Sequence, residues 1–332
     1  MNQDVLIIGQ GLTGSLLASA LEDEGFNFTI IDEDRPYTAS KNAAGIINPV
    51  TGRRFVKSWN YDLLEKIFIP AYDHIGLKIH APVLTPHVIR LCLSSIKEEN
   101  DLISQAMRYD YTSLINRCTE ELSFTHHILS AFDLTAFKVD IPGMISKLRK
   151  IWMDKNVLYP TAFNYDELVK KGKHWTYQGL EYEAVIFCEG ASIKNNPFFK
   201  YLPVIPNKGQ IMWIEAKELT SEISLKHHLI VTGPPDRKWI GATYEWEFLS
   251  EVPTNDGLAE LKKKFEDFVR IPYKIIDHQA GIRPTTKDRR PIIESHPMYE
   301  NLWAINGLGT KGASLGPFVI KEFLNQFKRE DG

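Results

Sequence analysis

The chain has 332 residues, of which 43% are hydrophobic and 24% are charged, and its formal net charge at pH 7 is -3. These values are typical of a folded protein with one or two domains, and they argue against disorder and against broad binding to nucleic acid or anionic membranes. No apolar run approaches the roughly 18 residues of a membrane span, and the N-terminus shows no signal peptide. The three scattered cysteines, Cys92, Cys118 and Cys188, favour a cytoplasmic location over a disulfide framework.

The first predicted strand and helix enclose a glycine motif. Residues 5–8 form the short β-branched and leucine run of a buried parallel strand, and an amphipathic helix follows. Between them the GxGxxG spacing permits a tight turn, a close approach of pyrophosphate to the backbone, and close helix–strand packing. Free N–H groups at the helix start would bind the phosphate. The predicted cofactor contacts in this motif are Gly9, Gly11, Leu12, Thr13 and Gly14.

A second buried strand, residues 28–31, ends at Asp32. A carboxylate at this position accepts hydrogen bonds from adenosine ribose hydroxyls and favours a free 2′-hydroxyl over a 2′-phosphate. Strand, glycine turn, helix, strand and acid follow one another within about thirty residues, which is the context that the motif needs. The pattern predicts a site for FAD or NAD rather than NADP; the alternative is a glycine turn in an unrelated α/β protein.

In the middle of the chain, segments typical of a nucleotide-binding domain alternate with segments typical of an antiparallel sheet. The segment "ASKNAAG", with Ser40, Ala44 and Gly45, is either a surface loop or backbone that lies against a flat ring system. A predicted helix capped by Asp140 follows, and then strand-like runs, the last of which ends at Gly190. If this last run is a late strand of the nucleotide-binding domain, that domain is assembled from separated segments. The intervening blocks read as half-buried, aromatic-rich strands and helices of a second domain, mostly antiparallel. Aromatic side chains in such strands either line a pocket or, more often, belong to the core of the sheet. The four concerned are Trp213, Trp239, Tyr244 and Trp246.

A second glycine turn, "NGLGTKGASLGP", lies between a predicted strand and the last predicted helix. One elongated cofactor, FAD, would contact both glycine turns. If the cofactor were NAD, the second glycine turn would have no cofactor to contact. Together the motifs resemble the FAD-dependent D-amino-acid oxidase superfamily, specifically its glycine oxidase and sarcosine oxidase-like branch. "GLGTKG" is also similar to the FAD domain of bifunctional tRNA-modifying oxidoreductases. The segments that carry the resemblance are "GQGLTG", Asp32, "ASKNAAGI", "VDIPGMISKL", "EAVIFCEGAS", "NKGQIMWIE", "IGATYE", "AGIRPTTKDRRPII" and "NGLGTKGASLGP".

The resemblance implies an α/β (α+β overall) fold, with a discontinuous Rossmann-like FAD-binding domain and a mostly antiparallel-sheet substrate domain. The first would comprise residues 1–80, 135–200 and 278–332, and the second residues 81–134 and 201–277. Gly9, Gly11, Gly14 and Asp32 would hold the ADP half of FAD. Pyrophosphate and flavin would lie near Ser40, Ala44, Gly45 and Gly190, and the flavin's pyrimidine edge near Gly307, Gly309, Thr310, Lys311 and Gly312.

Two side chains are the predicted catalytic residues. The resemblance places Arg283 where amino-acid oxidases bind the substrate carboxylate, and a planar guanidinium suits that task; the alternative is an ion pair with Asp288. Lys311 would stabilise negative charge on reduced flavin; the alternative is a solvated side chain. Glu294 replaces the glycine usual in the family, and no active-site tyrosine can be carried over. No cysteine or histidine context supports a covalent flavin link, so non-covalent FAD is expected.

The predicted function is cytoplasmic FAD-dependent oxidation of a C–N bond in a small amine or amino acid, with O2 or another electron acceptor. Alternatives are modification of a tRNA side chain, near the modest basic cluster Arg53, Arg54 and Lys57, and a non-catalytic flavin-binding protein. The pairs His126–His127 and His227–His228 are the nearest approach to a metal motif, and no metal site is predicted. The substrate, the acceptor and the oligomeric state are not predicted.

Overall fold

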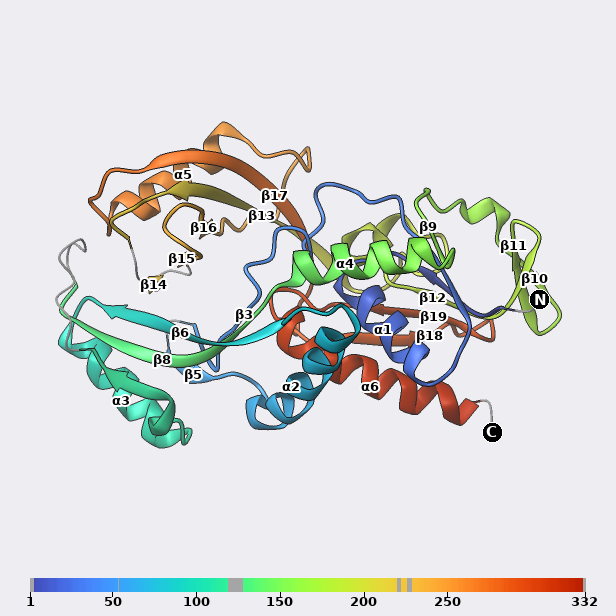
Figure 1. The fold of residues 1–332 in the computed structure, drawn as a ribbon, viewed down its shortest axis with the longest axis horizontal. Helices are drawn as coiled ribbons and strands as arrows, with labels where there is room; N and C mark the ends of the chain where they lie inside the picture. The colour runs from blue at the N-terminus through green and yellow to red at the C-terminus, as the bar shows by residue number, and fades with distance from the viewer. Residues whose placement is uncertain (1–2, 53, 119–127, 220–221, 226–228, 331–332) are drawn as a thin grey trace.

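The computed structural model describes residues 3–52, 54–118, 128–219, 222–225 and 229–330, and two large β-sheets dominate this part of the chain (Figure 1). The first sheet has a parallel centre in the order β19–β12–β1–β2–β9. The strands of this centre are, in chain order, β1 Gln3–Ile8, β2 Phe28–Ile31, β9 Leu158–Tyr159, β12 Leu180–Phe187 and β19 Leu302–Asn306. Antiparallel strands extend it: β10 Val169–Lys171, β11 His174–Tyr177 and β18 Ile292–Ser295. The strand order reverses direction at β1, which is where open α/β sheets bind ligands.

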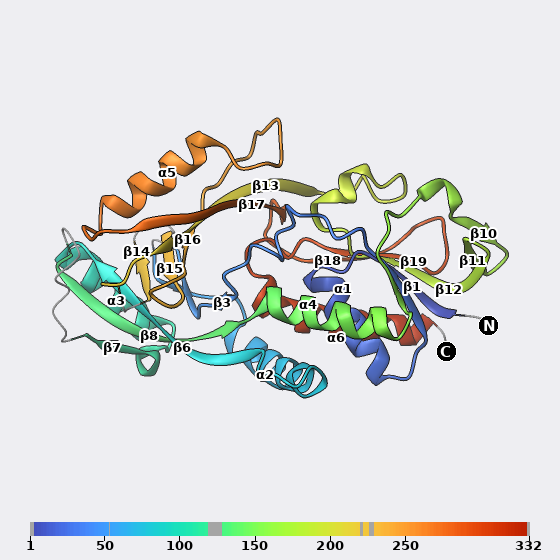
Figure 2. The same ribbon diagram turned by 45° about the horizontal axis from the view of Figure 1, so that its top comes forward.

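Helices cover one face of this sheet, and irregular segments cover the other (Figure 2). The helices are α1 Leu12–Asp23, α2 Tyr61–Lys78, α4 Ile141–Asp154 and α6 Gly312–Glu330. Val5 and Ile7 of β1 pack with them, whereas Leu6 and Ile8 pack against the opposite layer. Burial on both faces explains why residues 5–8 of this strand are all apolar instead of alternating with polar residues.

The second sheet is antiparallel except between β14 and β6. In spatial order it contains β17 Lys274–Thr286, β13 Val204–Glu215, β16 Lys238–Gly241, β15 Leu229–Thr232, β14 Ile223–Leu225, β6 Leu84–Leu93, β8 Ser130–Val139 and β3 Ile46–Ile47. Strand β7, Ile115–Arg117, pairs with β8, and β4 Val50–Thr51 pairs with β5 Val56–Lys57. Two helices pack on this sheet: α3 Ile96–Arg108 and α5 Asn255–Glu266. Short 3-10 turns complete the fold: Thr112–Leu114, Tyr165–Glu167 and Gly190–Asn195.

The predicted fold class is therefore confirmed, and so is the predicted helix cap at Asp140. Asp140 caps α4, because its Oδ1 accepts a hydrogen bond from Gly143 N at 3.0 Å. One of the predicted strand-like runs, "WTYQGLEY" at residues 175–182, is not a single strand, because the chain turns back at Gln178 (φ 48°) and Gly179 (φ 82°) to join β11 to β12. Positive φ at two consecutive residues is the geometry of a tight hairpin turn.

The division into domains stays a prediction, although the origin of each sheet is clear. The first sheet draws its strands from residues 3–31, 158–187 and 292–306, and the second from residues 46–47, 84–139 and 204–286. No helix in the described part of the chain combines the length and apolar character needed to cross a membrane. The histidine pairs at 126–127 and 227–228 lie outside the described residues.

Candidate functional site

A cavity of about 500 Å³ lies between the parallel sheet and the antiparallel sheet. It brings together residues that are far apart in the sequence, from the turn after β1 to the turn before α6. Among the predicted site residues, those that line it are Gly9, Gly11, Leu12, Thr13, Asp32, Ser40, Ala44, Gly45, Gly190, Arg283, Gly309, Thr310 and Gly312. Gly14, Gly307 and Lys311 are not among the lining residues.

The first glycine turn forms one end of the cavity. Gly9 has φ 98°, and a side chain there would place Cβ 2.6 Å from the carbonyl oxygen of Cys188. Gly11 caps α1 without any side-chain hydrogen bond to the first turn, and Leu12 N donates instead to Ser40 Oγ at 3.0 Å. The start of α1 therefore presents backbone N–H groups and a positive dipole end to the cavity, which fits a phosphate group.

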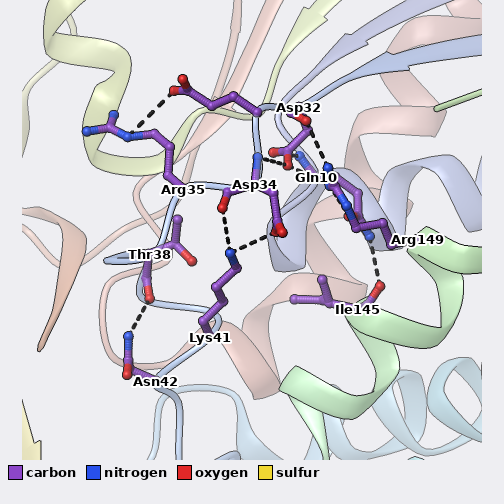
Figure 3. A network of polar contacts seen from close by, with 10 residues as sticks. Gln10, Asp32, Asp34, Arg35, Thr38, Lys41, Asn42, Ile145 and Arg149 are labelled. Atoms are coloured by element: carbon purple, nitrogen blue, oxygen red, sulfur yellow. Dashed lines mark hydrogen bonds and ion pairs between the residues drawn. The ribbon is translucent and has the colours of Figure 1, made fainter. Parts of the chain in front are cut away.

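Asp32 lies at the end of β2 and lines the same cavity, as predicted from its place in the chain. Three residues that the sequence did not single out contact its carboxylate: Gln10, in the glycine turn, Asp34, two positions farther along the chain, and Arg149, on α4 (Figure 3). The motif identifies Asp32 by its spacing, but Arg149 is reached only through the three-dimensional packing of α4 beside β2.

The loop that carries Ser40, Ala44 and Gly45 crosses the cavity and is fastened to the second sheet. Asn42 Nδ2 donates to the carbonyl oxygen of Ala280 at 2.8 Å, and Trp239 Nε1 donates to the carbonyl oxygen of Asn42 at 3.1 Å. Gly45 has φ 71°, and a Cβ there would lie 1.8 Å from the carbonyl oxygen of Val139. These contacts hold the loop as a fixed wall of the cavity.

The opposite end of the cavity contains Arg283 on β17. Its Nη1 donates to Asn207 Oδ1 at 2.7 Å and to the carbonyl oxygen of Thr243 at 3.2 Å, and its Cζ lies 4.7 Å from the centre of the Tyr244 ring. Gly209 leaves room for the guanidinium, because a Cβ there would lie 2.0 Å from Nη2. Burial lowers the pKa of Arg283 below its ordinary value.

Arg283 has no carboxylate partner within ion-pair distance in the described part of the chain. Asp288, the partner left open by the sequence, accepts a hydrogen bond from Arg290 N at 3.1 Å instead. The surrounding cavity wall is apolar, and its side chains come from the second sheet and the residues beside it: Ile211, Ile230, Trp239 and Ala242. Of the remaining predicted aromatics, Tyr244 lines the cavity, Trp213 packs beside this apolar cluster, and Trp246 is exposed.

The C-terminal glycine turn closes the side of the cavity. Gly309 has φ 54° and donates its N–H to the carbonyl oxygen of Pro284 at 3.0 Å, which holds the turn beside β17. Gly307, at φ 76°, packs beneath it near the carbonyl oxygen of Arg290. The Lys311 Nζ lies 3.2 Å from Ser58 Oγ, and burial lowers the pKa of Lys311 to about 8.

This lowered pKa predicts a dependence of stability on pH. Between pH 8 and the ordinary value of 10.5, the unfolded chain holds a proton at Lys311 that the folded chain has released. The free energy of unfolding contributed by this group therefore rises with pH across that window, by roughly 1–3 kcal/mol. Urea unfolding at pH 8 and pH 10 should show that the rise is reduced in Lys311→Met but kept in Lys321→Met, at an exposed position of α6, the helix that begins directly after Lys311. Equal rises in both variants would contradict the assignment.

Comparisons with known proteins agree with this geometry. The family model "FAD dependent oxidoreductase" (DAO) matches residues 4–323. The bifunctional protein MnmC of tRNA 5-methylaminomethyl-2-thiouridine biosynthesis from Legionella pneumophila (strain Philadelphia 1) is 22% identical over 98% of this chain, and the chain spans 54% of that protein's length.

Among solved structures, glycine oxidase from Geobacillus kaustophilus has the same fold, with a TM-score of 0.80, 19% identity and coverage of 99% of this chain and 95% of its own. L-α-glycerophosphate oxidase from Mycoplasma pneumoniae, solved with FAD bound, has a TM-score of 0.76, 14% identity and coverage of 99% and 95%. The start of α1, where the N-cap Gly11 offers no side-chain hydrogen bond, the close approach allowed by its glycines and the acid at the end of β2 all fit FAD as the cofactor. The chain belongs to the DAO family of FAD-dependent oxidoreductases.

Proposed function

We propose that this enzyme oxidises a C–N bond in an amine or amino acid that carries a carboxylate group. The observation that supports the proposal most strongly is Arg283, a half-buried cation in the cavity wall without an acidic partner among the described residues. A buried charge without a counter-ion is costly, and a substrate carboxylate would supply one. A guanidinium binds a carboxylate through two parallel N–H···O bonds, which fixes orientation as well as position.

The residues around Arg283 would then orient the substrate. Asn207 and the carbonyl oxygen of Thr243 hold Nη1, and the Tyr244 ring supports the guanidinium plane, so the fork is preorganised. The apolar wall that includes Trp239 would exclude water and receive an uncharged substituent. When bound, FAD supplies the hydride acceptor of the reaction. Thr310 of the C-terminal glycine turn lines the cavity, and its backbone N–H would stabilise negative charge there, whereas the N–H of Gly309 already donates to Pro284.

An anaerobic screen tests the proposed reaction. Purified protein with bound FAD is mixed with amines and amino acids, and loss of the flavin absorbance near ~450 nm reports reduction. Small amino acids are expected to reduce the flavin, whereas the corresponding amines without the carboxylate are expected to react much more slowly. Reduction by neither group would favour the non-catalytic alternative.

We also propose that FAD is held without a covalent bond. Of the cysteines and histidines that the structure describes, only Cys188 lines the cavity, and burial raises the pKa of its thiol, so the reactive thiolate is disfavoured. Acid precipitation should therefore release the flavin into the supernatant, measured by its absorbance there. A yellow pellet that keeps the flavin would contradict this prediction.

A second candidate substrate is a modified tRNA, and an exposed basic segment favours it. Lys287, Arg289 and Arg290 are exposed beside the C-terminal glycine turn, and Arg290 Cζ lies 4.3 Å from the centre of the half-exposed Trp59 ring. Cationic and aromatic side chains of this kind bind single-stranded nucleic acid. From the predicted basic cluster, Arg54 is exposed, Lys57 pairs with Asp62, and Arg53 lies outside the described residues. Filter binding of bulk tRNA at low and high salt distinguishes this candidate, since phosphate contacts weaken steeply with salt.

A further inference from the structure

The carboxylate of Asp32 accepts hydrogen bonds from three donors (Figure 3). Gln10 N donates to Oδ2 at 2.7 Å, and Asp34 N donates to Oδ1 at 2.9 Å. Arg149 Nη1 donates to Oδ1 at 2.7 Å, and Arg149 Nη2 donates to the backbone carbonyl oxygen of Asp32 at 2.9 Å. Arg149 therefore fixes both the side chain and the main chain at the end of β2.

These bonds leave one acceptor position of the carboxylate open. Each carboxylate oxygen accepts about two hydrogen bonds. Oδ1 of Asp32 already accepts two, from Asp34 and Arg149, whereas Oδ2 accepts one, from Gln10. Asp32 and Gln10 line the cavity and Arg149 does not, so Arg149 acts on the cavity through these two partners. The open position on Oδ2 is the one left for a hydroxyl group of a bound molecule.

Arg149 is itself held in place by the glycine turn. Gln10 Oε1 accepts a hydrogen bond from Arg149 Nη1 at 3.0 Å. Gln10 Nε2 donates to the carbonyl oxygen of Ile145 at 3.0 Å and to Ser15 Oγ at 3.1 Å, and Gln10 is buried. The network thus joins α4, α1 and the end of β2, and it orients the acid from behind the cavity wall.

The charge of Arg149 also matters, because this site must accept an anionic cofactor. The Arg149 and Asp32 side chains are only 13% and 19% exposed, so water screens them little. A phosphate group at the start of α1 would bring negative charge into the same cavity as the Asp32 carboxylate. The guanidinium of Arg149 offsets the charge of Asp32 and reduces this repulsion.

We propose that Arg149 is a positioning residue for the cofactor: it fixes and neutralises Asp32 so that Oδ2 accepts a hydroxyl of the adenosine ribose. It contributes to the affinity for ligands that carry adenosine, and it does not contribute to contacts with the flavin ring. The proposal depends on FAD as the cofactor and is independent of the substrate that Arg283 binds.

Titration of the flavin-free protein tests the proposal. In Arg149→Met, the Kd for FAD and for ADP should rise by about 10- to 100-fold, the loss typical when the partner that orients a ligating side chain is removed. The Kd for FMN, which lacks adenosine, should change by less than about twofold, because Arg149 acts only on the adenosine end of the site. The matched control is Lys150→Met, at an exposed position of the same helix, which should leave all three Kd values unchanged.

Two further variants separate positioning from a structural role. Arg149→Lys keeps the charge without the two-point fork, so it should recover part of the affinity for ADP. In an Asp32→Asn background, Arg149→Met should cause a smaller loss than it does alone, because the two residues act as a unit. Unchanged FAD affinity in Arg149→Met, equal losses for ADP and FMN, or additive effects in the double variant would each overturn the proposal. If Arg149→Met fails to fold, the Kd values for ADP and FMN are compared in Arg149→Lys and in Asp32→Asn instead.

Discussion

Arg283→Ala is expected to abolish reduction of the flavin by carboxylate substrates while FAD remains bound. The change removes the only guanidinium among the described residues at the apolar end of the cavity. It removes charge-assisted hydrogen bonds to the substrate and also the orientation that they impose. Because orientation and binding act together, the second-order rate constant of reduction should fall by about 10³-fold or more. Stopped-flow absorbance under anaerobic conditions measures this rate constant.

The control for this prediction is a substrate without a carboxylate. This substrate should reduce the flavin slowly, and at nearly the same rate in the wild type and in Arg283→Ala, because it offers Arg283 no carboxylate to bind. Gly209→Ala provides a second approach, since the new Cβ would lie 2.0 Å from Arg283 Nη2 and displace the guanidinium without removing it. If either variant reduces carboxylate substrates at the wild-type rate, the carboxylate-clamp proposal is wrong.

Local sequence patterns were enough to predict most of the cavity's first half. The turn at Gly9 and Gly11 and the acid at Asp32 follow from spacing alone, because strand, turn and helix are adjacent in the chain. The α/β class was predictable for a similar reason. A run that is apolar at every position, such as residues 5–8 of β1, indicates a strand buried on both faces.

Contacts between distant segments were not predictable in the same way. Arg149 meets Asp32 across 117 positions of sequence, and Asn42 meets Ala280 across 238. No periodicity or motif relates such pairs, because they depend on how α4 packs beside the first sheet and how β17 of the second sheet meets the loop after β2. Lys311 illustrates the same difficulty: its place in the turn is visible in the sequence, but its contact with Ser58 is not.

Among glycine-to-alanine substitutions in the N-terminal glycine turn, Gly14→Ala is expected to disrupt the cofactor site most. The new Cβ would lie 1.9 Å from the carbonyl oxygen of Gly9 and 3.0 Å from its carbonyl carbon. Both are backbone atoms, so no side-chain rotation relieves the clash, and α1 must move away from β1. We expect a loss of stability of about 2–4 kcal/mol and a rise in the Kd for FAD of about 100-fold or more.

Gly25→Ala is the matched control at the other end of the same helix. Gly25 has a positive φ of 81°, unlike Gly14, and a Cβ there meets no atom within 4 Å. It should therefore cost about 1 kcal/mol through backbone strain alone and leave the Kd for FAD unchanged. Urea unfolding and FAD titration of both variants separate the two effects. The role of Gly14 follows from its contact with the turn, so wild-type FAD affinity in Gly14→Ala would show that the turn can shift without losing the phosphate site.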